Sequence, residues 1–285
     1  MGEAAVSEPA PAKLNLFLRV LGRRADSFHE IDSLVQPLTL ADGVQARLGD
    51  GDVGLVVVGE CAADVPRDRD NLVMRAARAL GEAVGEPRGA ELLLQKRIPV
   101  AAGLGGGSAD AAATLRALDR LWGCGLAPTR LAEIGAAVGS DVPSQVHGVP
   151  VRVGGRGEVV ERQEVPKTWW ALVTLPFRVR AADAFTWWDE DGGRTGPEPS
   201  SFLEALAAED PERVAGRLFN DLEEPVRARH PEVARASASL LKAGALGTVM
   251  CGSGPTVAGL ARDGAHAEEL AAATGGIVVG SIVRV

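Results

Sequence analysis

The sequence contains no tyrosine, only three cysteines, and no long apolar run. Cys61, Cys124 and Cys251 lie far apart without a C-x-x-C pair, which argues against a disulfide framework and a structural zinc site. We therefore expect reduced thiols in a cytoplasmic protein. No stretch approaches the roughly 20 apolar residues that a membrane-spanning helix needs. Residues 1–11 have no secretory-signal pattern and are expected to form a short polar lead-in.

Runs of basic residues are also missing. The chain carries 30 Lys and Arg residues against 38 Asp and Glu residues, a net charge of −8. Because a nucleic-acid-binding protein usually presents a basic stripe, that class of partner is not expected. The 285 residues, 46% of them hydrophobic, can bury a substantial core in one large domain or two ordinary ones.

The order of helical and strand patterns predicts an α+β protein with two lobes. Strict alternation from Lys13 to Val20 indicates a strand. Further strands are expected at 53–58, 91–95, 149–153 and 169–175. Helices are expected at 71–83, 109–122, 129–138, 202–208, 214–218 and 233–243. Thr129 is predicted to cap the third of these, 189–200 to be an exposed loop, and 247–285 to run strand, turn, strand, helix, strand. We place the boundary near 161–167, giving domains 1–163 and 164–285.

A glycine-rich segment, Pro99 to Asp110, provides the strongest chemical signal. Glycines at 103 and 105–107 let backbone N–H groups approach a phosphate, and the helix that follows adds its positive N-terminal end. No Gly-Lys-Ser/Thr ends the segment, so it is not a Walker A loop. Ser108 stands where a dinucleotide fingerprint needs its third glycine. The alternative is a flexible linker before a helix.

Three weaker features accompany this loop. Lys13 and Asn15 are two residues apart on one strand, so their side chains reach the same side, although such a lysine is usually just solvated. Asp141 lies in a turn after a helix, where an acid more often forms the turn than acts as a base. Residues 250–256 form a second glycine turn, which in isolation is only a hairpin of unusual backbone geometry.

Together, these features resemble the galactokinase, homoserine kinase, mevalonate kinase and phosphomevalonate kinase (GHMP) superfamily, in the same order and with similar spacing. The resemblance runs from about Pro9 to the C-terminus. It includes segments 11–18, 25–30, 139–143 and 220–223 beside the two glycine turns. It implies a small-molecule kinase with an N-terminal ATP-binding lobe, a smaller C-terminal α/β lobe, and an active site in the cleft between them.

The resemblance also implies roles for individual residues. Lys13 and Asp141 match the catalytic pair beside the substrate hydroxyl, where Asp141 either accepts the proton or orients the hydroxyl. ATP, with Mg²⁺ as its partner, is the expected cofactor, and Ser108 is a weak candidate for a metal ligand. The expected ATP-binding residues are Pro99, Gly103, Leu104, Gly105, Gly106, Gly107, Ser108, Ala109 and Asn71.

Segment 25–30 resembles one branch of the family, whose acceptor is a cytidine-diphosphate-linked methylerythritol of the non-mevalonate isoprenoid pathway. Phe28, His29 and Phe185 are then expected to bind the cytosine. Phe28 replaces the tyrosine usual there and keeps its stacking face. Asn15 and Asp141 are further substrate-binding candidates. We expect a monomer or weak homodimer. The alternatives are another kinase of the superfamily, or a nucleotide-binding module without kinase activity.

Overall fold

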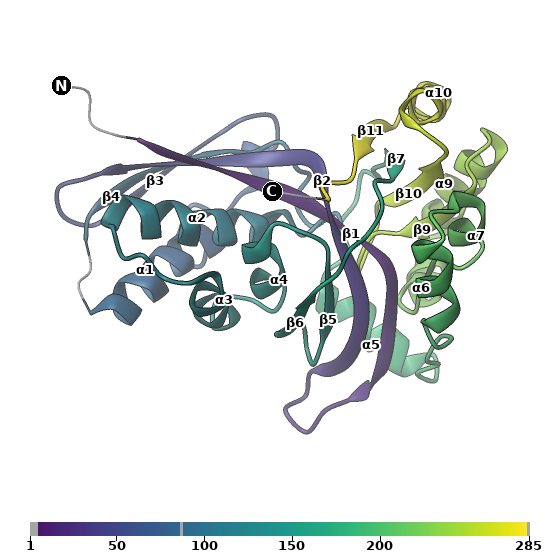
Figure 1. Ribbon diagram of the computed structural model, residues 1–285, viewed down its shortest axis with the longest axis horizontal. Helices are drawn as coiled ribbons and strands as arrows, with labels where there is room; N and C mark the ends of the chain where they lie inside the picture. Colours follow the sequence, from purple (N-terminus) through teal and green to yellow (C-terminus); the bar gives the residue numbers. More distant parts are fainter. Residues whose placement is uncertain (1–4, 86–87, 284–285) are drawn as a thin grey trace. The chain divides into compact units, whose positions relative to one another are not determined.

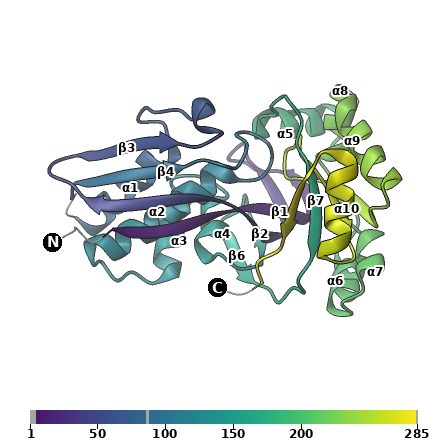
Figure 2. The ribbon, with the colours of Figure 1, turned by 90° about the horizontal axis from the view of Figure 1, so that it is seen from above.

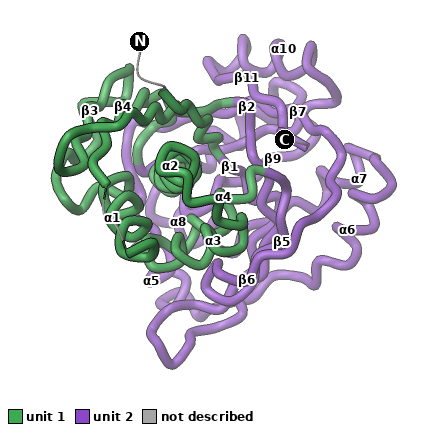
Figure 3. The backbone as a smooth tube through the Cα atoms, turned by 60° about the vertical axis from the view of Figure 1, so that its left-hand side comes forward, with its two compact units in different colours: residues 1–12, 40–100, 105–148 green, residues 13–39, 101–104, 149–285 purple. Residues whose placement is uncertain are grey.

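The computed structural model describes residues 5–85 and 88–283. The chain forms two compact units, each drawn from several segments (Figure 3). Unit 1 comprises residues 1–12, 40–100 and 105–148, and unit 2 comprises 13–39, 101–104 and 149–285. The domains 1–163 and 164–285 divide the sequence at a single point, and that assignment stays a prediction.

The sheet of unit 1 is built from two long strands and two short ones. β1 (Val6–Arg23) and β2 (His29–Leu48) continue into unit 2, whereas β3 (Val53–Val58) and β4 (Ala90–Gln95) belong to unit 1 alone. β4 pairs parallel with β3 and antiparallel with 43–48 of β2. Its residues alternate between buried and exposed, as a sheet with one covered face requires.

The polar lead-in predicted for residues 1–11 is wrong within the described residues, because β1 already begins at Val6. The Glu8 carboxylate is instead buried and accepts a hydrogen bond from Arg116 Nε at 2.8 Å. A paired carboxylate can be buried, and composition alone does not reveal the pairing.

Four α-helices of unit 1 cover one face of this sheet (Figures 1 and 2). They are α1 (Leu72–Val84), α2 (Gly106–Trp122), α3 (Pro128–Ala136) and α4 (Val142–His147), and a 3₁₀ turn, η1 (Ala62–Asp64), precedes them. Leu115, Leu118 and Trp122 of α2 are buried, as expected of a helix that packs against a sheet. The predicted Thr129 cap is wrong. Ala127 is the N-cap, and Pro128, whose fixed φ suits the first helical turn, starts the helix.

Unit 2 contains an antiparallel sheet of order β11-β7-β10-β9. Its strands are β7 (Trp169–Val173), β9 (Gly247–Met250), β10 (Val257–Ala261) and β11 (Ile277–Gly280). Helices α9 (Pro231–Lys242) and α10 (Gly264–Thr274) pack on it. The order predicted for 247–285 is thereby confirmed. Within the same unit, β5 (Val151–Gly154) joins β2 and β6 (Val159–Arg162), and β8 (Phe219–Asn220) runs parallel to β1.

The remaining helices of unit 2 are short. They are α5 (Ala181–Glu190), α6 (Ser200–Ala207), α7 (Pro211–Ala215) and α8 (Glu223–Arg229). The loop predicted for 189–200 is too long, because α5 includes Asp189 and α6 begins at Ser200. The helix predicted at 214–218 lies three residues earlier. Elements this short show little hydrophobic periodicity, which explains why α4, α5, α8, β6 and β8 were not predicted. Among the described residues, no helix has the length and apolarity to cross a membrane.

Candidate active site

The backbone of the glycine-rich segment adopts a conformation that residues with a side chain would rarely adopt. Gly103 and Gly105 adopt φ of 79° and 66°, in the left-handed region that glycine enters without strain. A Cβ atom on Gly103 would lie 1.9 Å from the carbonyl oxygen of Cys251. This contact joins the two glycine turns within unit 2, so glycine at 103 is required by packing as well as by φ.

Helix α2 begins at Gly106, three residues earlier than predicted. Gly106, Gly107 and Ser108 therefore form its first turn rather than a loop. Its N-cap is Gly105, which has no side chain to accept the first backbone N–H groups. Unpaired N–H groups and the positive end of the helix dipole make this turn suited to an anion such as phosphate.

A buried charged cluster lies beneath this first turn, and we did not predict it from the sequence. Lys96 Nζ donates to Asp42 Oδ2 at 2.5 Å and to Asp110 Oδ2 at 2.6 Å. A Cβ on Gly106 would lie 3.0 Å from the same Nζ. Burial raises the pKa of Asp110 to about 7, against the lowering effect of Lys96. Burial disfavours the Lys96 ammonium, but the charges of Asp110 and Asp42 outweigh it and raise the pKa of Lys96.

Asn71 is the N-cap of α1. Its Oδ1 accepts from the Val73 N–H at 2.8 Å, and its Nδ2 donates to the Pro66 carbonyl at 2.5 Å. The side chain is almost fully buried and has a capping role of its own. The predicted contact of Asn71 with the nucleotide stays a prediction.

Lys13 and Asn15 lie together on β1, as their spacing predicted. Lys13 Nζ donates to Asn15 Oδ1 at 2.6 Å, and Asn15 Nδ2 donates to Ser33 Oγ on β2 at 2.8 Å. Ser33 in turn donates to the Phe17 carbonyl at 2.5 Å. Lys13 is 6% exposed, so the solvated-lysine alternative is wrong. The hydrogen-bond chain holds the ammonium in one place.

The late glycine turn packs against Lys13. A Cβ on Gly252, whose φ is 51°, would lie 2.6 Å from Lys13 Nζ. Asn220 holds this turn by donating to the carbonyls of Met250 and Gly252 at 2.8 and 2.7 Å. Glu223 accepts the Met250 N–H at 2.9 Å, and burial raises its pKa. Segment 220–223 therefore shapes the backbone beside Lys13.

The three residues predicted to bind cytosine all lie in unit 2. The rings of His29 and Phe185 stack with centroids 4.7 Å apart, and His29 Nε2 lies 3.0 Å from Asp189 Oδ1. Phe28 is 47% exposed, and the Arg156 guanidinium lies 4.8 Å from its ring centroid. His29 and Phe185 are thus already partners of each other, whereas Phe28 offers an accessible ring.

Asp141 belongs to unit 1, where it is the N-cap of α4. Its side chain is exposed and makes no capping hydrogen bond. It therefore does not serve the helix-capping role that usually explains an acid in such a turn.

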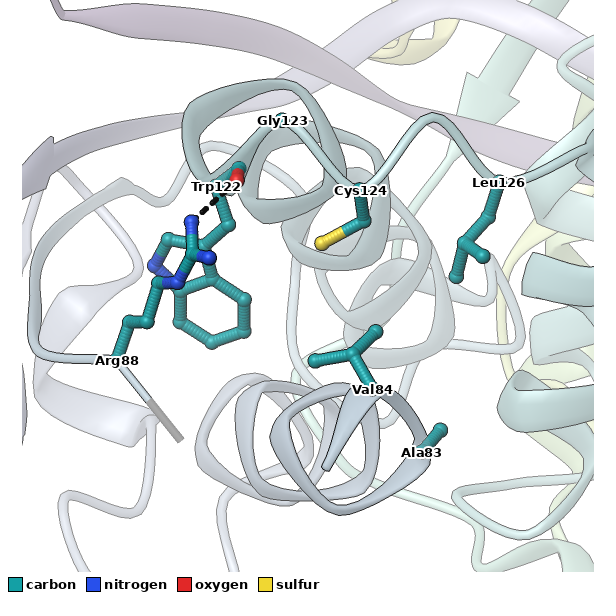
Figure 4. A pocket seen from close by; sticks show the side chains of 7 residues that line it. All are labelled: Ala83, Val84, Arg88, Trp122, Gly123, Cys124 and Leu126. Atoms are coloured by element: carbon teal, nitrogen blue, oxygen red, sulfur yellow. Dashed lines mark hydrogen bonds between the residues drawn. The ribbon is translucent and has the colours of Figure 1, made fainter. Parts of the chain in front are cut away.

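A cavity of about 360 Å³ lies at the other end of α2 (Figure 4). Arg88 Nη1 donates to the Trp122 carbonyl at its edge, at 2.6 Å. Gly106 and Trp122 are separated by about 24 Å of helix, at 1.5 Å per residue. None of the predicted site residues lines the cavity. Its lining is Ala83, Val84, Arg88, Trp122, Gly123, Cys124 and Leu126.

Two family models match the chain. Residues 71–149 match the GHMP kinases N terminal domain, and residues 202–274 match the GHMP kinases C terminal model. The first match contains the glycine-rich segment and Asp141, and the second contains segment 220–223 and the late glycine turn.

Curated relatives match nearly the whole chain. A protein of Pelotomaculum thermopropionicum named 4-diphosphocytidyl-2-C-methyl-D-erythritol kinase is 42% identical, over 92% of this chain and 91% of the relative. A protein of the same name from Gloeobacter violaceus is 40% identical, over 94% of this chain and 89% of the relative.

Two solved structures are similar in fold to this chain. The crystal structure of a 4-(cytidine 5'-diphospho)-2C-methyl-D-erythritol kinase has a TM-score of 0.81 and 33% identity, over 98% of this chain and 100% of that one. A homoserine kinase from Cytophaga hutchinsonii has a TM-score of 0.75 and 20% identity, over 98% of this chain and 95% of that one. At that identity the likeness shows a shared fold alone.

Proposed function

The chain belongs to the GHMP kinase family, and we propose that its glycine turns and Lys13 serve the transfer of phosphate from ATP to an alcohol. It is a small-molecule kinase that phosphorylates the 2-hydroxyl of 4-diphosphocytidyl-2-C-methyl-D-erythritol, giving the 2-phosphate and ADP, in the non-mevalonate isoprenoid precursor pathway. The observation that carries this assignment is about 40% identity to kinases of that name over nearly the full length of both chains. The predicted α+β fold of two lobes agrees with the family.

The first turn of α2 is proposed to bind the ATP phosphates. Its free N–H groups and helix dipole suit the β- and γ-phosphates, and Gly107 leaves room for close approach. The proposed ATP-binding residues are those predicted: Pro99, Gly103, Leu104, Gly105, Gly106, Gly107, Ser108, Ala109 and Asn71.

Mg²⁺ fits this arrangement as a partner of the nucleotide rather than as a resident ion. Within residues 5–85 and 88–283, no group of three or more His, Cys, Asp or Glu side chains is placed to hold a metal ion. Mg²⁺ in kinases is held largely by phosphate oxygens and water, with few protein ligands. The half-buried Ser108 hydroxyl, in the first turn of α2, is the proposed protein ligand. When bound, the ion would neutralise phosphate charge.

Lys13 and Asp141 are proposed to act on the acceptor hydroxyl. The Lys13 ammonium, fixed by Asn15, supplies positive charge to the oxygen and to the charge that spreads over the transferred phosphoryl group. Asp141 accepts the hydroxyl proton or orients the hydroxyl for in-line attack. The hydrogen bond from Lys13 leaves Asn15 a positioning role, beside the substrate contact predicted for it.

Recognition of the cytosine is proposed to use Phe28, His29 and Phe185. The exposed ring of Phe28 provides the stacking face. His29 and Phe185 form a stacked pair held by Asp189, which suits them to support the base from a fixed position. A cytoplasmic location and a monomer or weak homodimer complete the proposal.

The decisive experiment measures ADP formation with 4-diphosphocytidyl-2-C-methyl-D-erythritol as acceptor, and with homoserine and mevalonate as controls. ADP release that depends only on the cytidylylated alcohol is the expected result. Turnover with homoserine or mevalonate instead would leave the kinase fold standing and refute the acceptor. Binding of ATP without turnover of any acceptor would favour the nucleotide-binding module.

A further inference from the structure

The buried cluster of Asp42, Lys96 and Asp110 is not used by the chemistry proposed above. Its members come from β2, from the residue after β4, and from the second turn of α2. The side chains of all three are at least 96% buried, and all three residues lie in unit 1. Even when buried charges are paired, replacing them by well-packed apolar side chains is often neutral or stabilising, so the presence of this group calls for a reason beyond packing.

The cluster connects the two ends of the glycine-rich segment. Asp42 Oδ1 accepts the N–H groups of Arg97 and Ile98, at 2.5 and 2.8 Å, immediately before Pro99. Asp110 is part of α2 itself, and Lys96 bridges it to Asp42. The segment that leads into the loop and the helix that follows it are therefore joined through one ammonium group.

The charges of the cluster lie close to the proposed phosphate site. Lys96 Nζ is directly beneath Gly106, and Asp110 is four residues further along α2, about 6 Å of helix rise. One ammonium and two carboxylates give the cluster a formal net charge of −1. Because electrostatic interactions are weakly screened inside a protein, a change of one charge here acts strongly on a bound polyphosphate.

Among the described residues, one carboxylate oxygen of the cluster has no hydrogen-bond partner. Asp110 Oδ1 is buried and accepts no hydrogen bond from the described residues. Asp42 uses both of its oxygens, one for Lys96 and one for the backbone. A group that served packing alone would be better satisfied, or replaced by an apolar one.

We propose that Asp42, Lys96 and Asp110 form a positioning site that holds the phosphate-binding turn in place and sets, through its net charge, the affinity of that turn for ATP. The inference rests on the proposed function for the identity of the ligand. Asp42 orients the entry to the loop, Lys96 fixes the start of α2 from below, and Asp110 limits the positive field of the lysine.

Substitutions that change the charge of the cluster in opposite directions should change its affinity for the nucleotide in opposite directions, which tests this inference. Asp110→Asn removes one negative charge, and its carbonyl oxygen still accepts from Lys96. Lys96→Gln removes the positive charge and keeps one donor. The double substitution returns the net charge to −1. The probe is the nonhydrolysable analogue AMP-PNP with Mg²⁺, titrated by calorimetry at pH 8.5, which is above the pKa of about 7 to which burial raises Asp110.

Asp110→Asn should bind AMP-PNP about threefold to tenfold more tightly than wild type, and Lys96→Gln about tenfold more weakly. The Kd of the double variant should stay within about twofold of the wild-type value. Glu8→Gln is the matched control. Glu8 is a buried carboxylate that pairs with Arg116 and Arg120 of α2, which lie about 15 and about 21 Å of helix rise from Gly106. Its removal should change Kd by less than twofold.

A role in stability alone predicts a different pattern. The double variant would then bind most weakly, or all variants would bind like Glu8→Gln, and either result overturns the inference. If Lys96→Gln does not fold, Asp110→Asn and the double variant still separate the two explanations, because the first should bind AMP-PNP more tightly than wild type and the second about as tightly as wild type. Wild-type protein that binds AMP-PNP but phosphorylates no acceptor would refute the proposed function and leave this inference standing. Wild-type protein that fails to bind AMP-PNP would refute both.

Discussion

Ser33→Ala should slow catalysis although Ser33 is not one of the proposed substrate-binding residues. The Ser33 hydroxyl accepts from Asn15 Nδ2 at 2.8 Å and donates to the Phe17 carbonyl at 2.5 Å. Asn15 in turn accepts from Lys13 Nζ. Alanine removes the group that fixes the Asn15 amide, so the amide and the lysine that it holds are free to turn.

The magnitude follows from the burial of these groups. Ser33 is fully buried and Asn15 is 4% exposed, so the amide that loses its acceptor finds no water. An unsatisfied buried donor costs about 1–3 kcal/mol of stability. If loss of orientation raises the barrier to phosphoryl transfer by about 1.4 kcal/mol, kcat falls about tenfold. We expect a fall of 10- to 100-fold, with little change in KM for ATP.

The assay is steady-state ADP formation with 4-diphosphocytidyl-2-C-methyl-D-erythritol, beside urea unfolding of each variant. Ser237→Ala is the matched control, because Ser237 is a buried serine of unit 2 whose hydroxyl lies 2.6 Å from Thr248 Oγ1, between α9 and β9. It should lose similar stability and keep its kcat. Ser33→Thr, which retains the hydroxyl, should recover most of the rate. Equal kcat in Ser33→Ala and Ser237→Ala would refute the reasoning.

Three further predictions follow from the site. Asp141→Asn should lower kcat at least 100-fold while AMP-PNP binding and the urea midpoint stay unchanged, because the side chain is exposed and does not cap α4; unchanged turnover would remove Asp141 from the mechanism. Phe28→Leu should raise KM for the cytidylylated alcohol about tenfold and leave KM for ATP unaltered, since it removes an exposed stacking ring; an equal rise for both substrates would argue against stacking. Burial raises the pKa of Glu223, so the native state holds this proton more tightly than the unfolded state, and its contribution to the free energy of unfolding decreases as pH rises from about 4.3 through the raised pKa. Glu223→Gln should flatten that decrease in urea titrations across pH 4 to 8, and an unchanged slope would contradict the assignment.

Several elements of the fold were predictable because their signals are local. Strand β1 and helix α2 carry long periodic patterns, and both were found, although β1 starts earlier and α2 begins at Gly106. The errors concern residues whose environment is set elsewhere. Thr129 looked like a cap, but the preceding proline starts the helix. Residues 189–200 looked like a loop, but Asp189 lies in α5 beside His29.

In the candidate site, too, the contacts between residues close in sequence were predictable and those between distant residues were not. The spacing of Lys13 and Asn15 on one strand was enough to predict that their side chains meet, and their contact at 2.6 Å confirms it. Nothing in the sequence indicated that Ser33 completes this chain, because its partner Asn15 is 18 residues away on another strand. The stacking of His29 on Phe185 likewise joins residues that are distant in sequence.

The sequence by itself therefore determined the family, the glycine turns and the likeness to a kinase, since these depend on short motifs whose backbone geometry glycine dictates. Only the tertiary structure decided which charges lie beneath the first turn of α2, the proposed phosphate site. Asp42, Lys96 and Asp110 come together because β2 pairs with β4, whose end leads toward the start of α2. Such a cluster depends on strand register and helix packing, and long-range contacts of this kind have no signature in local spacing.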